Sequence, residues 1–142
     1  MWSVEKINQF IADKVEENLY LDYKASDALG KSDSKKNEIS KDVSAFANSD
    51  GGVIIYGIKE FRKDTNFLPE KIDPVKRDEF SKETLEQIIN TRISPTIHGI
   101  IITPTSPTIR YLAIACDETV PNRLYMTYAD ISGYIRAFRI DL

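Results

Sequence analysis

The chain has 142 residues, 42% hydrophobic and 29% charged, which fits one compact domain over residues 1–142 with a core of its own. A single cysteine excludes an internal disulfide and a CxxC metal site, and no apolar stretch is long enough for a membrane span or a signal peptide, so a cytoplasmic location is expected. The net charge of −3 weighs against avid, nonspecific binding to nucleic acid.

The N-terminal segment predicts a helix followed by a strand. Ser3 is suited to cap the helix, which is expected to end near residues 17–18. Its apolar positions recur at helical spacing: Val4, Ile7, Phe10, Ile11 and Val15. Residues 19–24 then alternate, so a strand would place Leu19, Leu21 and Tyr23 on one face and Tyr20, Asp22 and Lys24 on the other.

The stretch 39–58 predicts a second helix, a glycine turn and a central strand. A polar loop precedes this helix, and Asp33 or Ser34 is a plausible cap. The segment Asn48–Gly52 should stop the helix, because glycine adopts the left-handed conformation without a Cβ penalty. The run that follows, residues 53–58, is nearly all apolar and rich in β-branched residues, which indicates a strand covered on both faces.

The second half of the chain predicts a third helix and four strands. Residues 59–72 show no sustained period and are expected to form a connection. Asp73 and Pro74 suit the start of a helix that continues to about Arg92. Strands are expected at 100–103 and 109–115, with a further pair at 124–128 and 134–140. The sum is an α/β fold with a single mixed sheet of about six strands and about three helices.

Three motifs resemble the Schlafen-type AlbA-like domain family, which carries labels of DNA binding and ATP binding. They are the block 44–58, the pattern of Glu17, Leu21, Asp22, Tyr23 and Lys24, and the segment Gly133–Arg136. The resemblance spans residues 17–136 and implies a mixed α/β domain that binds RNA or DNA. Because the chain ends soon after the last motif, it is either a short free-standing protein or the N-terminal domain of a longer one.

The first candidate site joins acids and a lysine. Asp22 and Lys24 share a strand face, where a carboxylate can hold a divalent cation and an ammonium can stabilise charge on a phosphate. The resemblance implies that Glu17 and Asp22 bind Mg²⁺ or Mn²⁺ with a third acid in relatives that are nucleases. Here that acid would be Glu60, which needs a bulge or a loop to join them, because Lys59 comes first and neighbours on a strand point to opposite faces. One alternative function is therefore a divalent-metal-dependent endoribonuclease with Glu17, Asp22, Lys24 and Glu60 as catalytic residues.

The second candidate site is basic and carries the leading hypothesis, nucleic-acid binding. Cations and aromatic side chains on one surface would grip phosphates and stack on bases. The candidates are Lys24, Lys35, Lys36, Lys41, Arg136, Tyr20 and Tyr134. A solvated helix face explains the lysines of 35–41 equally well, and a regulatory or protein-interaction module, as a homodimer or beside a further domain, is the other alternative. ATP binding is not expected, because Gly51 and Gly52 follow a helix C-terminus and no GxxxxGK[ST] occurs.

Overall fold

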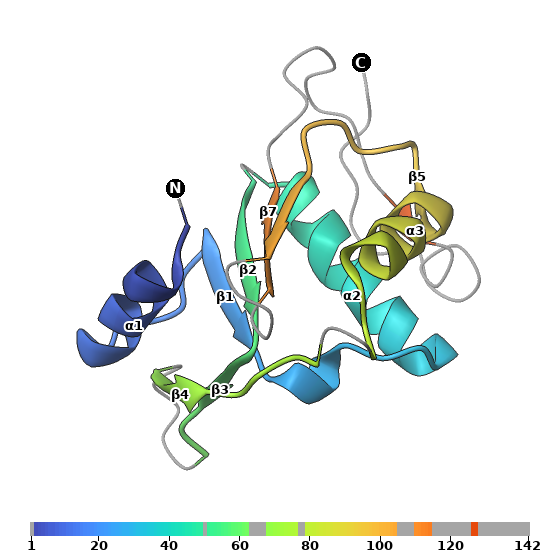
Figure 1. Cartoon of the computed structure of the whole chain (residues 1–142). Coiled ribbons are helices and arrows are strands. Elements are labelled where there is room, and N and C mark those ends of the chain that lie inside the picture. The colour runs from blue at the N-terminus through green and yellow to red at the C-terminus, as the bar shows by residue number, and fades with distance from the viewer. Residues whose placement is uncertain are drawn as a thin grey trace.

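The computed structural model describes residues 2–49, 51–62, 68–76, 79–104, 110–114 and 126–127. These residues form a mixed α/β fold with three α-helices, which confirms the predicted fold class (Figure 1). The elements are α1 (Val4–Ala12), β1 (Leu21–Lys24), the short 3-10 helix η1 (Ser26–Ala28), α2 (Asp33–Ala47), β2 (Gly52–Tyr56), β3 (Ile58–Glu60), β4 (Pro69–Ile72), α3 (Lys82–Arg92), β5 (Ile93–Ser94), β6 (Ile101–Pro104), β7 (Arg110–Ile114) and β8 (Met126–Thr127). No helix in these ranges is both long and apolar enough to cross a membrane.

The central sheet is mixed and has the strand order β1-β2-β7-β6. Strands β1 and β2 run parallel, with Lys24 opposite Tyr56, and α2 makes the crossover between them. The pairs β2–β7 and β6–β7 are antiparallel. The other strands form two-stranded ribbons, β3–β4 and β5–β8. The strands are therefore distributed over one main sheet and two ribbons.

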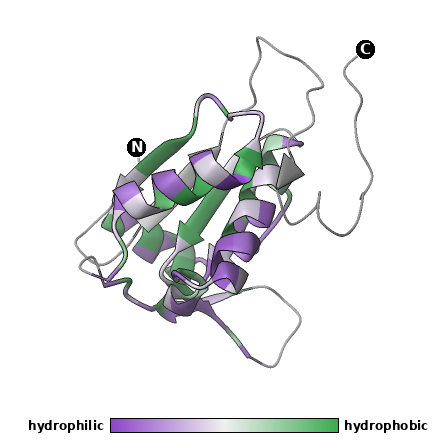
Figure 2. Cartoon of the chain, turned by 90° about the vertical axis from the view of Figure 1, so that its right-hand side faces the viewer, coloured by the Kyte–Doolittle hydropathy of each residue, from purple (hydrophilic) through white to green (hydrophobic). Residues whose placement is uncertain are grey.

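Helices cover the two faces of the central sheet, with α1 on one side and α2 and α3 on the other (Figure 1). Each side has its own hydrophobic core. The α1 side buries Ile7, Leu21, Tyr23, Ile55 and Ile58. The α2 side buries a larger group that includes Ile39, Val43, Ile54, Tyr56, Leu85 and Ile89. The strands of the sheet are accordingly the most hydrophobic part in Figure 2, whereas the helices carry polar bands.

The first helix is capped as predicted but is shorter than predicted. The Ser3 hydroxyl accepts a hydrogen bond from the Lys6 backbone N–H at 3.2 Å. The helix ends at Ala12 rather than near residues 17–18, because Lys14 adopts a positive φ of 50° and turns the chain toward β1. Leu19, predicted to share a strand face with Leu21 and Tyr23, lies outside the strand, which begins at Leu21, and is 80% exposed.

The helix, glycine turn and strand of the central stretch are confirmed. The cap of helix α2 is Ser32, which accepts from the Lys35 N–H at 3.2 Å, so the predicted caps Asp33 and Ser34 are wrong by one and two residues. After α2, Gly51 has a φ of 79° and Gly52 a φ of 152°. A Cβ at Gly52 would collide with the Phe46 ring, so this turn brings β2 against the end of α2.

Two predictions for the segment 59–92 are wrong. The expected connection contains the β3–β4 ribbon, whose strands are short, charged and therefore without a clear period. The third helix starts at Lys82 rather than at Asp73, and Ser81 caps it by accepting from the Thr84 N–H at 3.1 Å. The Asp73 carboxylate instead accepts from the N–H and the hydroxyl of Ser26, each at 2.8 Å. That alternative partner explains why Asp73 does not cap a helix.

The predictions for the C-terminal strands are confirmed where they can be compared. Strands β6 and β7 occupy the predicted positions and pair with each other. Strand β8 lies within the predicted strand 124–128, but it pairs with β5, which was not predicted. The predicted strand 134–140, with Tyr134 and Arg136, lies outside the described residues.

Candidate functional site

Glu17 is held beside β1 by the tight turn that precedes the strand. The turn before the strand closes on itself, with backbone hydrogen bonds between Asn18 and Leu21 in both directions at 3.0 and 3.2 Å. This turn brings the Glu17 carboxylate back to the strand, where Oε1 accepts the Tyr23 N–H at 2.7 Å. The predicted proximity of Glu17 and Asp22 therefore arises from a tight turn rather than from a helix end.

Lys24 lies between two carboxylates. Its Nζ is 2.9 Å from Asp22 Oδ2, and 3.8 Å from Asp42 Oδ2 on α2. All three side chains are roughly 70–80% buried, with exposed fractions of 30%, 20% and 31%. Burial acts to lower the pKa of Lys24, but its hydrogen bond to Asp22 and the charges of Asp22 and Asp42 outweigh this, and the pKa is raised. The ammonium is thus held on the α2 side of the sheet in its charged form.

Glu60, at the end of β3, lies in the same region. The register of the β3–β4 ribbon shifts between Lys59 and Glu60, but the extra residue lies on β4, because Lys59 pairs with Lys71 and Glu60 with Pro69. Burial is the main cause that raises the pKa of Glu60, a hydrogen bond with Glu17 acts to lower it, and the charge of Asp22 raises it further. The structure thus brings Glu17, Asp22, Lys24 and Glu60 together.

The pKa of Glu17 is raised because the side chain is partly buried and lies near other acids. Burial, the hydrogen bond with Asp22 and the negative charges of Asp22 and Glu60 raise this pKa to about 8, against the opposing effect of the Tyr23 N–H. The raised pKa favours the protonated form of Glu17, which reduces the repulsion among the three acids. The region has more negative charge than the single ammonium of Lys24 can offset.

Asp42 is the member of the site that sequence reasoning missed. Burial raises its pKa despite the nearby ammonium of Lys24. A signal was present in the sequence: Asp42 lies three residues after Ile39 and four before Phe46, so it places a carboxylate within the apolar stripe of α2.

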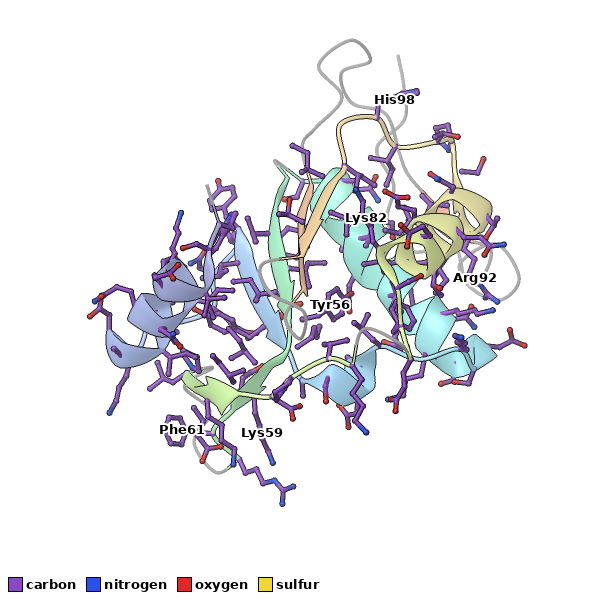
Figure 3. The ribbon with its side chains drawn as sticks, viewed as in Figure 1. Tyr56, Lys59, Phe61, Lys82, Arg92 and His98 are labelled. Atoms are coloured by element: carbon purple, nitrogen blue, oxygen red, sulfur yellow. The ribbon has the colours of Figure 1, made fainter. Side chains whose placement is uncertain are left out.

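Tyr56 completes the region from β2. It points toward the α2 side of the sheet (Figure 3), where its side chain is fully buried in the larger core. Its hydroxyl has no hydrogen-bond partner within the described ranges. Burial, followed by the charges of Asp42 and Asp22, raises the pKa of Tyr56. The phenol therefore stays protonated next to the two carboxylates.

The donor chemistry suits a hard divalent cation, because Mg²⁺ and Mn²⁺ prefer carboxylate oxygens. The arrangement does not yet match a metal site: among the described residues, no three Asp, Glu, His or Cys side chains are placed to hold a metal ion. Glu17 Oε1 is occupied by the Tyr23 N–H, and Asp22 Oδ2 by the ammonium of Lys24. These side chains are of the right chemical kind for a cation, but their printed contacts are to protein groups: the Tyr23 N–H and the Lys24 ammonium.

The predicted basic residues within the described ranges lie on β1 and on α2. Lys24 belongs to the acid cluster, whereas Lys35 and Lys36 lie in the first turns of α2. Lys41 forms an ion pair with Glu38 at 3.0 Å and is partly neutralised. Tyr20 is 53% exposed just before β1. Lys24 and Lys41 both lie close enough to Asp42 for their charges to act on its carboxyl group, and the single basic surface expected from the sequence stays a prediction.

Comparison with known proteins adds a family and a fold. The sequence model of the Schlafen, AlbA_2 family matches residues 17–139. Among solved structures, the chain is similar to the DIP2311 protein from Corynebacterium diphtheriae, with a TM-score of 0.54 and 17% sequence identity. The similarity covers 89% of this chain and 24% of that protein, so the chain spans about a quarter of its length. At this identity the likeness shows the fold alone. No curated protein sequence matches the chain significantly.

Proposed function

The chain belongs to the Schlafen, AlbA_2 family, a family of nucleic-acid-related domains, and from this premise we propose that it binds RNA or DNA through the phosphate backbone. The observation that carries the proposal is a basic surface at the start of α2, made by Lys31, Lys35 and Lys36. None of these three has a carboxylate within ion-pair distance in the described part of the chain. Uncompensated cations attract polyanions and release their counterions.

The charge distribution favours this basic surface over the surroundings of Lys24 as the place where phosphates bind. A phosphodiester approaching Lys24 would meet Asp22 and Asp42 as well, and like charges repel. At the start of α2 the acid present, Asp33, is engaged by Arg92 at 2.9 Å. We therefore place the main phosphate contacts on α2, with Tyr134 and Arg136 remaining predictions.

Fluorescence anisotropy with labelled single-stranded RNA and DNA over a salt series tests the proposal. Replacing Lys35 and Lys36 by glutamine should weaken binding and reduce the slope of log K against log salt by about 1.4, since each lost contact to a single strand contributes about 0.7. Lys71→Gln, an exposed lysine on β4, is the matched control and should leave the slope unchanged. Absence of binding at low salt would refute the proposal.

We also propose a second candidate function, divalent-metal-dependent cleavage of RNA. The specific observation in its favour is the convergence of Glu17, Asp22 and Glu60 next to an ammonium that remains charged. Lys24 is suited to stabilise negative charge on a phosphate, and Asp22 and Asp42 position it. Glu17 would have to give up its proton, because a proton and a cation compete for the same oxygens.

Incubation of structured RNA with and without Mn²⁺ tests this second function. Cleavage should depend on the metal and disappear in Asp22→Asn, a variant that keeps the shape of the side chain. Asp27→Asn, at an exposed acid on η1, should cleave normally. Cleavage that is unchanged in Asp22→Asn would exclude this assignment and would leave the proposal of nucleic-acid binding intact.

A further inference from the structure

A concave pocket of about 340 Å³ lies between the start of α2 and one face of α3. The contributions of α3 follow a helical repeat of three and four residues, so they form a stripe along a single face. The lining residues are Lys31, Lys36, Thr84, Gln87, Ile88, Thr91 and Arg92. Apart from Ile88, all of these side chains are polar or cationic. The pocket is therefore a polar recess rather than an apolar groove.

Arg92 is held rigidly at one side of this recess. Its two terminal nitrogens donate to side chains of α2, to Asn37 Oδ1 at 2.6 Å and to Asp33 Oδ1 at 2.9 Å. These bonds join α3 to α2, and Figure 3 shows the Arg92 side chain beside the two helices. The guanidinium has five N–H donors, and within the described part of the chain two of them are used in these bonds. Because the Arg92 guanidinium is already held in place by these bonds, it loses little conformational entropy when it binds an anion.

The charge of the recess is positive. Asp33 compensates the guanidinium of Arg92, whereas Lys31 and Lys36 have no ion-pair partner among the described residues. Two cations are thus left without a counterion, together with the exposed amide of Gln87. A dianion that accepts several hydrogen bonds would neutralise this charge, and a phosphate monoester has a charge of about −1.5 to −2 near pH 7.

The volume of the recess limits the size of the ligand that it can hold. A volume of about 340 Å³ lies at the lower end of the range of about 300–1,000 Å³ for small-molecule sites. It fits a phosphate group with the adjoining sugar better than a complete dinucleotide cofactor. We propose that the recess between α2 and α3 binds the terminal phosphate monoester of a nucleic-acid strand. This inference rests on the nucleic-acid binding proposed above, and it adds a preference for phosphorylated strand ends.

Competition between strand ends tests the inference on the full chain. Anisotropy would compare one oligonucleotide with a 5′-phosphate, a 3′-phosphate or hydroxyl groups at both ends. The wild-type protein should bind one of the phosphorylated forms about three- to tenfold more tightly, as expected for partly exposed charge-assisted hydrogen bonds. The double variant Lys31→Gln/Lys36→Gln should lose this preference. Lys35→Gln, next to the recess on the same basic surface, should weaken all three forms equally and retain the preference.

The outcomes separate the two proposals. Equal affinity of the wild-type protein for all three forms would overturn the terminal-phosphate site while leaving nucleic-acid binding in place. A preference that persists in the double variant would also overturn it, because the preference would then arise elsewhere. No binding of any form at low salt would refute nucleic-acid binding and the inference together. Urea unfolding of each variant confirms that lost preference does not reflect lost folding.

Discussion

Replacing Glu17 by glutamine should make the stability of the protein less dependent on pH. The glutamine side chain would keep the acceptor for the Tyr23 N–H and would donate to Asp22 without a titrating proton. In the wild-type protein the raised pKa of Glu17 means that the folded state binds the proton more tightly than the unfolded state. The stabilisation by this proton is fully present below pH 4.5 and is lost as the pH rises toward about 8.

The size of the effect follows from the pKa of Glu17. A rise from 4.5 to about 8 corresponds to at most about 5 kcal/mol. Glu17 is only half-buried, so screening by water lowers the expected value to about 2 kcal/mol. The variant should therefore equal the wild-type protein near pH 4.5 and should be about 2 kcal/mol more stable near pH 9.

Urea unfolding at a series of pH values between 4.5 and 9 measures this difference. The m-value should be the same for both proteins, because the folded surface does not change. Glu16→Gln, at the neighbouring exposed acid, is the control and should show a constant difference from the wild-type protein. A constant difference for Glu17→Gln as well would show that Glu17 is not held in the protonated form, and the argument for a crowded acid cluster would fail.

Three further substitutions test the packing around the site. Tyr23→Phe removes the hydroxyl that donates to the Val15 carbonyl at 2.8 Å and should cost about 1 kcal/mol in urea unfolding. Tyr56→Phe removes a buried hydroxyl without a partner in the described ranges and should be neutral or stabilising by up to about 1 kcal/mol. Equal losses of unfolding free energy in Tyr23→Phe and Tyr56→Phe would contradict the assigned hydrogen bonds. Gly52→Ala should cost about 2–3 kcal/mol, because φ is 152° and the new methyl group would meet the Phe46 ring; a cost below about 0.5 kcal/mol would show that the turn can shift.

Several elements of the fold can be predicted from the sequence because their signals are local. Ser3 caps α1, and the two glycines end α2 and lead into β2, as the sequence indicates. The alternation before Lys24 correctly places Leu21 and Tyr23 on a buried face. Caps, glycine conformations and apolar periods act over one or two helical turns, so a single stretch of sequence contains the whole signal.

Other elements depend on contacts that the local sequence does not record. The β3–β4 ribbon has short, charged strands, and its pairing stabilises residues whose own pattern predicts a connection. Asp73 precedes a proline as a helix cap often does, yet its carboxylate accepts hydrogen bonds from Ser26, which is 47 residues away in the sequence. Where a side chain has several suitable partners, the one that folding brings near decides its role.

The candidate site combines both kinds of information. The strand alternation places Asp22 and Lys24 on a shared face, and the resemblance to the Schlafen family is what groups Glu17 and Glu60 with them. Only the tertiary structure adds Asp42, from the helix that crosses over between β1 and β2, and shows that Glu60 of β3 lies near Glu17. The proton on Glu17 depends on all of these groups at once, because burial and like charges act through space rather than along the chain.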